Sequence, residues 1–148
     1  MIRDATPHDY PHIQALLAAH QMVPALFVPA SRWWVATLDD GTICGAIGVE
    51  YGYATPVWLL RSAIVAPEAR GAGRGVALTN AVIAAARHSQ QAAIYCFSTD
   101  AGEFWIKMGF SEVAVTELLQ MLPDAPQVAQ FTALDWLASE VAWRYTVQ

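Results

Sequence analysis

Residues 59–89 constrain the fold more than any other stretch of the chain. They read LLRSAIVAPEARGAGRGVALTNAVIAAARHS: an apolar strand, a turn at Ala66-Pro67, a glycine-rich basic loop and then a helix. Backbone N–H groups at the start of a helix have no intrahelical partner and carry the positive end of the helix dipole, so they bind anions. Glycines let a phosphate approach the backbone, where a side chain would block it. This stretch therefore predicts a binding site for a phosphate chain.

Two common nucleotide-binding motifs do not fit the spacing of this loop. The P-loop pattern G-x-x-x-x-G-K-S/T is absent, because no Lys-Ser or Lys-Thr pair follows the glycines. The dinucleotide fingerprint G-x-G-x-x-G also fails, since the third glycine comes one place early and residues 90–95 lack the ribose-binding acid. The pattern that remains is R-x-x-G-x-G, after a strand and Val-Ala-Pro.

This pattern resembles motif A of the GNAT superfamily of acetyl-CoA-dependent N-acetyltransferases, whose loop holds the coenzyme A pyrophosphate. A glycine loop alone is also compatible with a simple tight turn, but here the strand and the helix on either side fit the motif as well. The resemblance implies that the backbone of Ile64 and Val65 pairs with the pantetheine arm. It assigns the pyrophosphate to the loop itself, with charge-assisted contacts from the arginines: Arg70, Gly71, Ala72, Gly73, Arg74 and Gly75.

Residues 101–110, AGEFWIKMGF, resemble a second landmark of the family, A-x-x-F-Y/F-x-K/R-x-G-F. In the family this helix carries aromatic and basic groups beside the thiol end of the cofactor. The resemblance therefore adds four cofactor-binding residues: Thr99, Phe104, Trp105 and Lys107.

The group that protonates the leaving thiolate is not identified by the sequence. The family often has Tyr at the position of Trp105, and an indole cannot donate a proton to a thiolate at a useful pH. Trp105 is therefore expected to pack against the acetyl-pantetheine end. Protonation is left to solvent or to one of four side chains: Ser98, Thr99, Tyr51 or Tyr53.

Glu50 is the candidate general base or water-positioning group. It ends a strand with few charges, and burial can tune a carboxyl group toward such a role. The alternative is a solvated Glu at the end of a strand. Arg61 interrupts an apolar strand, where an unpaired charge is costly. It is expected either to anchor an acceptor carboxylate or to form a structural ion pair with Glu50.

Composition and charge agree with a small anionic ligand. The 148 residues are 55% hydrophobic and 14% charged, which argues against disorder. A net charge of −5 argues against nucleic acid as the main partner, yet Arg61, Arg70 and Arg74 fall close together. His8 and His12 stand four places apart without a third ligand at a recognisable spacing, so no metal site is expected.

The chain is also expected to be a cytoplasmic protein. No run of about eighteen apolar residues predicts a membrane span, and no apolar signal segment follows Met1. Cys44 and Cys96 lack metal or redox spacing and are predicted to be buried reduced thiols. The apolar surplus, with a mean hydropathy of +0.32, suggests a homodimer.

The order of predicted elements matches the GNAT fold over nearly the whole chain. The resemblance implies an α/β (mixed α+β) architecture, with a central mixed, twisted sheet of about seven strands flanked by helices. One GNAT N-acetyltransferase domain is expected over residues 1–148, with residues 21–32 beside the acceptor pocket. Strands are predicted at 2–5, 33–38, 42–51, 57–65, 92–98, 112–118 and 141–147. Helices are predicted at 9–20, after the glycine loop, at 101–108 and within 123–134.

Three details of the predicted elements bear on packing. In the helix after the glycine loop, one apolar core face is predicted: Leu78, Ala81, Val82 and Ala85. The strand that follows this helix is expected to run parallel to strand 57–65 in a β-α-β unit. Gly109 is expected to end the helix before it in a left-handed conformation.

A subgroup of the family also shows in the sequence. GAIGVE ending at Glu50, LLRS at 59–62 and AQF at 129–131 resemble small amino-acid acetyltransferases of the arsenic-resistance (arsinothricin) and phosphinothricin types. Residues 135–140 keep only a trace of that subgroup's usual C-P-A-S-A-V. The resemblance implies acetyl transfer from acetyl-CoA to the amino group of a small amino acid or amino-acid-like compound, by direct attack on the thioester. The alternatives are acetylation of a protein N-terminus, a lysine or another amine, or a non-catalytic acyl-CoA-binding sensor.

Overall fold

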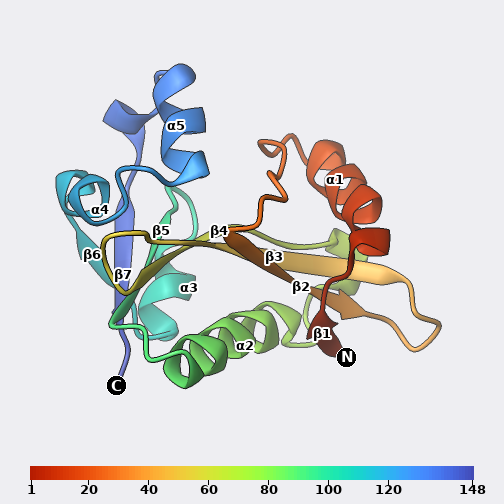
Figure 1. The fold of residues 1–148 in the computed structure, drawn as a ribbon. Coiled ribbons are helices and arrows are strands. Elements are labelled where there is room, and N and C mark those ends of the chain that lie inside the picture. Colours follow the sequence, from red (N-terminus) through yellow and green to blue (C-terminus); the bar gives the residue numbers. More distant parts are fainter. The chain divides into compact units, whose positions relative to one another are not determined.

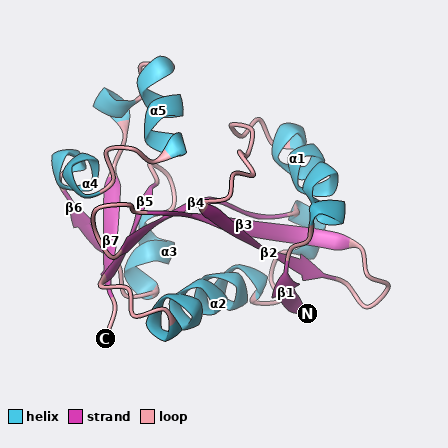
Figure 2. Cartoon of the chain, viewed as in Figure 1, coloured by secondary structure: helices cyan, strands magenta, loops and turns pink.

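The computed structural model describes residues 1–148 and contains seven strands and five α-helices, shown in chain order in Figure 1 and by type in Figure 2. The strands are β1 (Ile2–Asp4), β2 (Ser31–Thr37), β3 (Ile43–Tyr51), β4 (Val57–Val65), β5 (Ala93–Phe97), β6 (Ser111–Val113) and β7 (Ala142–Thr146). The helices are α1 (Tyr10–Ala19), α2 (Arg74–His88), α3 (Gly102–Lys107), α4 (Val115–Met121) and α5 (Pro126–Ala133). Short 3-10 turns lie at Pro7–Asp9, Pro67–Ala69 and Leu137–Ser139.

The strands form one mixed sheet in the order β1-β2-β3-β4-β5-β7-β6. β4 and β5 run parallel, with Leu59 opposite Tyr95, whereas β7 is antiparallel to both β5 and β6. α2 lies between β4 and β5 in the chain, so the predicted β-α-β unit is confirmed. The seven-stranded mixed sheet flanked by helices confirms the predicted fold class.

The chain folds as two compact units, which are described separately. The first unit consists of Met1–Val49 and Ser62–Val82, and the second of Glu50–Arg61 and Ile83–Gln148. The chain passes from one unit to the other within β3, β4 and α2. A single functional domain over residues 1–148 stays a prediction.

The core of the first unit forms around α1 and β2. Ile13 and Leu17 are four residues apart on α1 and are fully buried, as the apolar spacing predicts. They pack in one cluster with Trp33 and Val35 of β2 and with Ile64 of β4. Two stacked rings continue the cluster into the loop before β2: Tyr10 and Phe27 lie parallel with ring centroids 3.9 Å apart.

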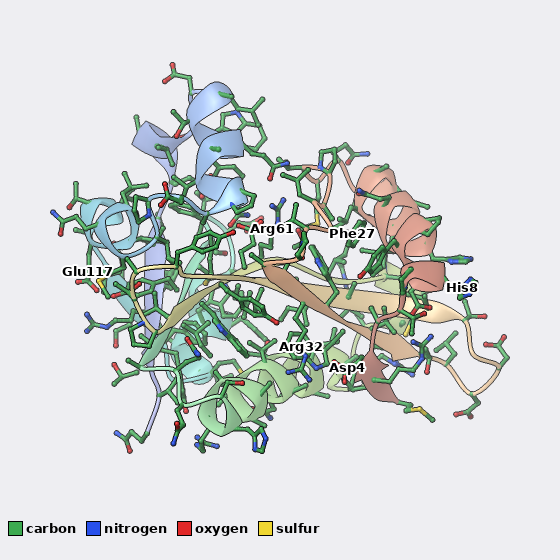
Figure 3. The ribbon with its side chains drawn as sticks, viewed as in Figure 1. Asp4, His8, Phe27, Arg32, Arg61 and Glu117 are labelled. Atoms are coloured by element: carbon green, nitrogen blue, oxygen red, sulfur yellow. The ribbon has the colours of Figure 1, made fainter.

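Polar contacts fix the N-terminal end of the first unit. Asp9 directly precedes α1, where an aspartate often caps a helix, but its side chain does not cap this one. Its carboxylate instead accepts two hydrogen bonds from the Arg3 guanidinium, at 2.7 and 3.0 Å, and one from the Thr6 N–H at 2.8 Å. On the neighbouring strands Arg32 donates to Asp4 at 2.9 Å, and these two side chains lie together in Figure 3.

The core of the second unit packs β4, β5 and β7 against α4 and the start of α5. Leu59, Tyr95, Leu118 and Ala142 are buried together in one apolar cluster. Around the Tyr95 hydroxyl, Glu117 Oε2 accepts hydrogen bonds at 2.7 Å from both Tyr95 and Arg144. These bonds tie α4 to the two strands.

One predicted strand was wrong, and one predicted helix face was right for only half of its residues. The strand predicted at 112–118 ends at Val113, and α4 begins at Val115. Val113 and Val115 resemble the alternation of a strand, but the following Glu-Leu-Leu-Gln-Met favours a helix, which buries Leu118.

In α2 the buried side chains are Leu78, Thr79, Val82, Ile83 and Ala86, whereas Ala81 and Ala85 are only half-buried. Alanines lie on several sides of this helix, so the sequence pattern alone does not define which face is buried.

Two further expectations concern the cysteines and the end of α3. Cys44 and Cys96 are both buried free thiols, as predicted. Gly109 has a φ of +97° directly after α3, which confirms the left-handed helix end. None of the helices combines the length and the apolar character that crossing a membrane requires.

Candidate active site

In the first unit, the end of β4 leads into the predicted phosphate-binding loop. Ile64 is 7% exposed and packs in the apolar cluster, while Val65 is half-buried. Although the strand is apolar in sequence, Ala63 is exposed and Ser62 is half-buried. Because Ala63 is exposed to solvent, the strand is accessible directly before Ile64 and Val65, the residues predicted to pair with the pantetheine arm.

The glycines of the loop adopt conformations that other residues avoid. Gly71 has a φ of +89° and Gly73 a φ of +74°. A Cβ added at either position would meet no atom within 4 Å, so the surrounding space does not require glycine. The left-handed backbone requires it. The loop is therefore both open and shaped by its glycines.

Two arginines hold the loop in place through backbone carbonyls. Arg70 Nε donates to Val65 O at 3.0 Å, and Arg74 Nη1 donates to Ala69 O at 2.8 Å. A guanidinium has five N–H donors, so each arginine also has N–H groups beyond the one used here. α2 begins at Arg74, runs for fifteen residues and has no acidic residue in its first turn. Its N-terminus and the two cations together suit a bound anion.

In the second unit, the two predicted catalytic residues form a buried ion pair. Arg61 Nη1 lies 2.8 Å from Glu50 Oε2, and both side chains are 0% exposed. The Arg61 side chain is labelled in Figure 3. The ion-pair alternative for Arg61 is thus confirmed as a contact, and the solvated alternative for Glu50 is wrong. The role of either residue in catalysis stays a prediction.

The second oxygen of Glu50 has a partner that the sequence did not reveal. Glu50 Oε1 accepts the backbone N–H of Gln127 at 2.9 Å. Gln127 lies in the first turn of α5, directly after Pro126, so the carboxylate also caps this helix. A carboxylate offers about four lone-pair directions, so two accepted bonds leave it able to accept more.

The helix predicted to lie beside the thiol end of the cofactor, α3, places its residues in different environments. Trp105 is 4% exposed and packs edge-on against Phe104 and Phe110, with centroid distances of 5.0 and 5.1 Å. Its indole N–H is buried without a hydrogen-bond partner. Lys107 and Thr99 are exposed. Trp105 is thus part of the core around Phe110, and its contact with a cofactor stays a prediction.

The candidate proton donors are not gathered at one point of the second unit. Tyr51 lies at the end of β3 and packs against Trp58, with ring centroids 5.5 Å apart. Tyr53 is 75% exposed in the turn after β3. Ser98 follows β5, where its carbonyl accepts the indole N–H of Trp143 at 2.9 Å. No single candidate stands out by its geometry.

The predicted site residues therefore form two groups. The first unit contains those assigned to the pyrophosphate and the pantetheine arm: Ile64, Val65, Arg70, Gly71, Ala72, Gly73, Arg74 and Gly75. The second contains those assigned to the thiol end and to catalysis: Glu50, Arg61, Thr99, Phe104, Trp105 and Lys107. His8 and His12 are exposed, and no cluster of three or more metal-ligating side chains is present.

Two residues with unusual surroundings were missed by sequence reasoning. Gln127 is 6% exposed on α5, and the only signal for it was an amide between apolar residues in a helix. Glu140, before β7, has its pKa raised, mainly by burial and secondly by the negative charge of Asp100. Nothing in its local sequence predicts that burial.

Comparison with known proteins gives one family and one fold. The family model described as "Acetyltransferase (GNAT) domain" matches residues 29–112. No curated protein sequence matches the chain.

Solved structures share the fold along the whole chain. N-acetylglutamate synthase from Neisseria gonorrhoeae, complexed with coenzyme A and N-acetyl-glutamate, has a TM-score of 0.79 at 20% identity, and the match covers 100% of this chain and 35% of that one. A GNAT-family acetyltransferase from Staphylococcus aureus Mu50 has a TM-score of 0.78 at 14% identity, covering 100% and 99%. Nourseothricin acetyltransferase has a TM-score of 0.68 at 22% identity, covering 100% and 98%. The chain thus spans about a third of the length of the synthase, and at these identities the likeness concerns the fold alone.

Proposed function

The chain belongs to the GNAT acetyltransferase family, and from that premise we propose that its acceptor is a small amino acid or amino-acid-like compound. Family membership makes the chain an N-acetyltransferase with acetyl-CoA as the donor. The acceptor class and the role of each residue are the proposal. We place the reaction in the cytoplasm, in agreement with two buried free thiols.

The observation that carries the acceptor class is the buried cation of Arg61. The Arg61 guanidinium has 0% exposure in the middle of a strand, and the Glu50 carboxylate at 2.8 Å offsets its desolvation cost, which is on the order of several kcal/mol for a buried ion. The planar guanidinium can donate two parallel hydrogen bonds to a carboxylate, a geometry that no other side chain matches. The N-acetylglutamate synthase that shares the fold is complexed with N-acetyl-glutamate, a carboxylate-bearing product of the same chemical class. Arg61 is therefore proposed as the anchor of the acceptor carboxylate.

Glu50 is proposed to accept the proton that the amine loses, directly or through a water molecule. Acetyl-CoA supplies an activated thioester: the amine nitrogen forms a bond to its carbonyl carbon, the bond to sulfur breaks, and the amine loses a proton. Glu50 is a carboxylate with further acceptor directions, tied to the same guanidinium that would hold the substrate. This arrangement would set the amine at a fixed distance from a proton acceptor.

The first unit is proposed to bind the donor. The N–H groups at the start of α2 and the left-handed loop from Arg70 to Gly75 would hold the pyrophosphate, with Arg70 and Arg74 adding charge. The backbone of Ile64 and Val65, next to exposed Ala63, would pair with the pantetheine arm. Thr99, Phe104, Trp105 and Lys107 keep their proposed place at the thiol end by family resemblance.

A thiol-release assay with acetyl-CoA tests this proposal. The acceptor panel contains amino acids, phosphinothricin, arsinothricin, polyamines and a lysine peptide. Arg61→Lys keeps the positive charge but removes the fork, so the turnover of carboxylate-bearing amines should fall by about tenfold or more. The affinity for coenzyme A, measured by calorimetry, should remain unchanged because no residue of the 70–75 loop is altered.

The other outcomes separate the alternatives. Turnover of polyamines or the lysine peptide alone, unaffected by Arg61→Lys, would support an acetyltransferase for cationic amines. Coenzyme A binding with no turnover on any amine would support an acyl-CoA sensor, for which the buried Trp105 in place of the usual Tyr is the relevant observation.

A further inference from the structure

Gln127 has a buried side-chain atom without a hydrogen-bond partner. The residue is 6% exposed, and its amide Oε1 accepts no hydrogen bond. An acceptor buried without a partner costs about 1–3 kcal/mol, and native structures pair nearly all of them. A leucine or methionine would fill a similar volume without that cost. The glutamine at this position therefore needs an explanation.

The position of Gln127 on α5 is fixed from two sides. Its neighbour Val128 lies in the apolar cluster, and Phe131, one turn later, packs against Phe97 with ring centroids 5.2 Å apart. Pro126 has no N–H, and the residue before it, Ala125, has no side chain that can cap the helix. The Gln127 N–H is thus the first donor of the helix, and Glu50 Oε1 accepts it.

Glu50 connects this amide to the proposed anchor of the acceptor. Its two oxygens bond Arg61 Nη1 at 2.8 Å and the Gln127 N–H at 2.9 Å. The guanidinium and the backbone of Gln127 are therefore held by the same buried carboxylate. The backbone of Gln127 is therefore part of this buried polar cluster within the second unit, and its buried side chain leaves the helix from the same residue.

We infer that Gln127 Oε1 accepts a hydrogen bond from the amino group of the acceptor, which makes Gln127 a specificity-determining residue. This inference rests on the proposed function, in which Arg61 anchors the acceptor carboxylate. An amide oxygen is an acceptor for an N–H and offers nothing to a second carboxylate. It is also neutral, so it can orient the amine without stabilising the ammonium form as a carboxylate would. The bond uses an N–H and leaves the nitrogen lone pair free to attack.

The test combines a protein variant with a ligand variant. Binding of L-glutamate and of glutarate, which lacks the amino group, is measured by calorimetry with coenzyme A present, for wild type and Gln127→Leu. If another amino acid is the better acceptor in the thiol-release panel, that acid and its deamino analogue are used. Gln127→Leu should weaken the amino acid about tenfold, the equivalent of one hydrogen bond, and should change binding of the deamino analogue less than about twofold.

Two controls separate this role from a structural one. Gln130→Leu removes another glutamine amide from α5, one turn away, and should leave the ratio between the two affinities at its wild-type value. Without ligand, Gln127→Leu should melt at the same temperature as wild type or higher, because the buried acceptor without a partner is gone. A drop in melting temperature together with equal weakening of both ligands would overturn the inference.

Failure of the proposed function would look different. If wild type acetylates a carboxylate-bearing amine but Gln127→Leu weakens both ligands alike or neither, only the role of Gln127 is wrong. If wild type neither binds nor acetylates any carboxylate-bearing amine, the proposed function and this inference fall together.

Discussion

The buried pair of Arg61 and Glu50 allows a stability prediction with a definite size. Both side chains are 0% exposed and are joined by a 2.8 Å contact. Arg61→Met removes the cation and leaves a buried carboxylate with the Gln127 N–H as its donor. Breaking one partner of a buried pair costs about 3–5 kcal/mol, so the free energy of unfolding should fall by that amount.

Replacing both partners should cost far less. In Arg61→Met/Glu50→Leu no buried charge remains, and the main loss is the acceptor for the first N–H of α5. A lost helix cap is worth about 1 kcal/mol, so the double variant should be less stable than wild type by that amount and more stable than Arg61→Met. Urea denaturation followed by circular dichroism measures wild type, Arg61→Met, Glu50→Leu and the double variant, with equal slopes required for the comparison.

The result that would refute this reasoning is additivity. If the double variant loses the sum of the two single losses, the two side chains do not compensate each other in the folded protein. The buried ion pair would then not be the contact that ties β4 to β3 and α5, and its use as an anchor would lose support.

Three further predictions concern the loop, the N-terminal contacts and assembly. Gly73→Ala should lower stability by about 1 kcal/mol and raise the KM for acetyl-CoA, because alanine is strained at a φ of +74°. Gly41→Ala, strained in the same way at a φ of +86° between β2 and β3, should lower stability without changing that KM in the same thiol-release assay. Hydrogen bonds from Arg3 hold the pKa of Asp9 well below its usual range, so Asp9 contributes full stability above the pKa of an unfolded aspartate, about 3.9, and loses that contribution as the pH falls further. In Asp9→Asn, the free energy of unfolding should fall less steeply than in wild type as the pH is lowered from about 4 to about 2. An unchanged pH dependence would contradict this assignment. The proposed homodimer predicts twice the chain mass by light scattering at working concentration, and a monomer mass would exclude it.

Local sequence patterns were enough for the parts of the fold that depend on neighbours in the chain. The apolar run of β4, the glycine loop and α2 follow one another, so this arrangement of strand, loop and helix could be predicted from a single stretch. The left-handed Gly109 is equally local, since it follows directly from a helix end.

Features that depend on distant contacts could not be predicted. Val113 and Val115 look like alternating strand residues, and the helix in their place is favoured by the burial of Leu118 against Leu59 and Tyr95, far away in the chain. The contact between Glu50 and the Gln127 backbone joins residues 77 positions apart. A pattern within a window of a dozen residues carries no information about such a pair.

The site was predicted as residue types but not as an arrangement. The sequence named Glu50 and Arg61 because charges are unusual in apolar strands, and the structure adds that they contact each other with no exposure. It could not indicate Gln127, since a glutamine in a helix is ordinary until its burial is known. The exposure of Ala63 in a central strand could likewise not be predicted, because the sequence around it is apolar.

One measurement tests the central claim most directly. The rate of thiol release from acetyl-CoA is compared for an amino acid acceptor and for its carboxamide, which keeps the same amine and lacks the carboxylate. A site built around the Arg61 guanidinium should prefer the free acid by about 100-fold in kcat/KM, since a neutral carboxamide cannot replace the charge-assisted hydrogen bonds between a carboxylate and a guanidinium. Equal rates for the two, or faster release with the carboxamide, would contradict the claim that this acetyltransferase selects carboxylate-bearing amines.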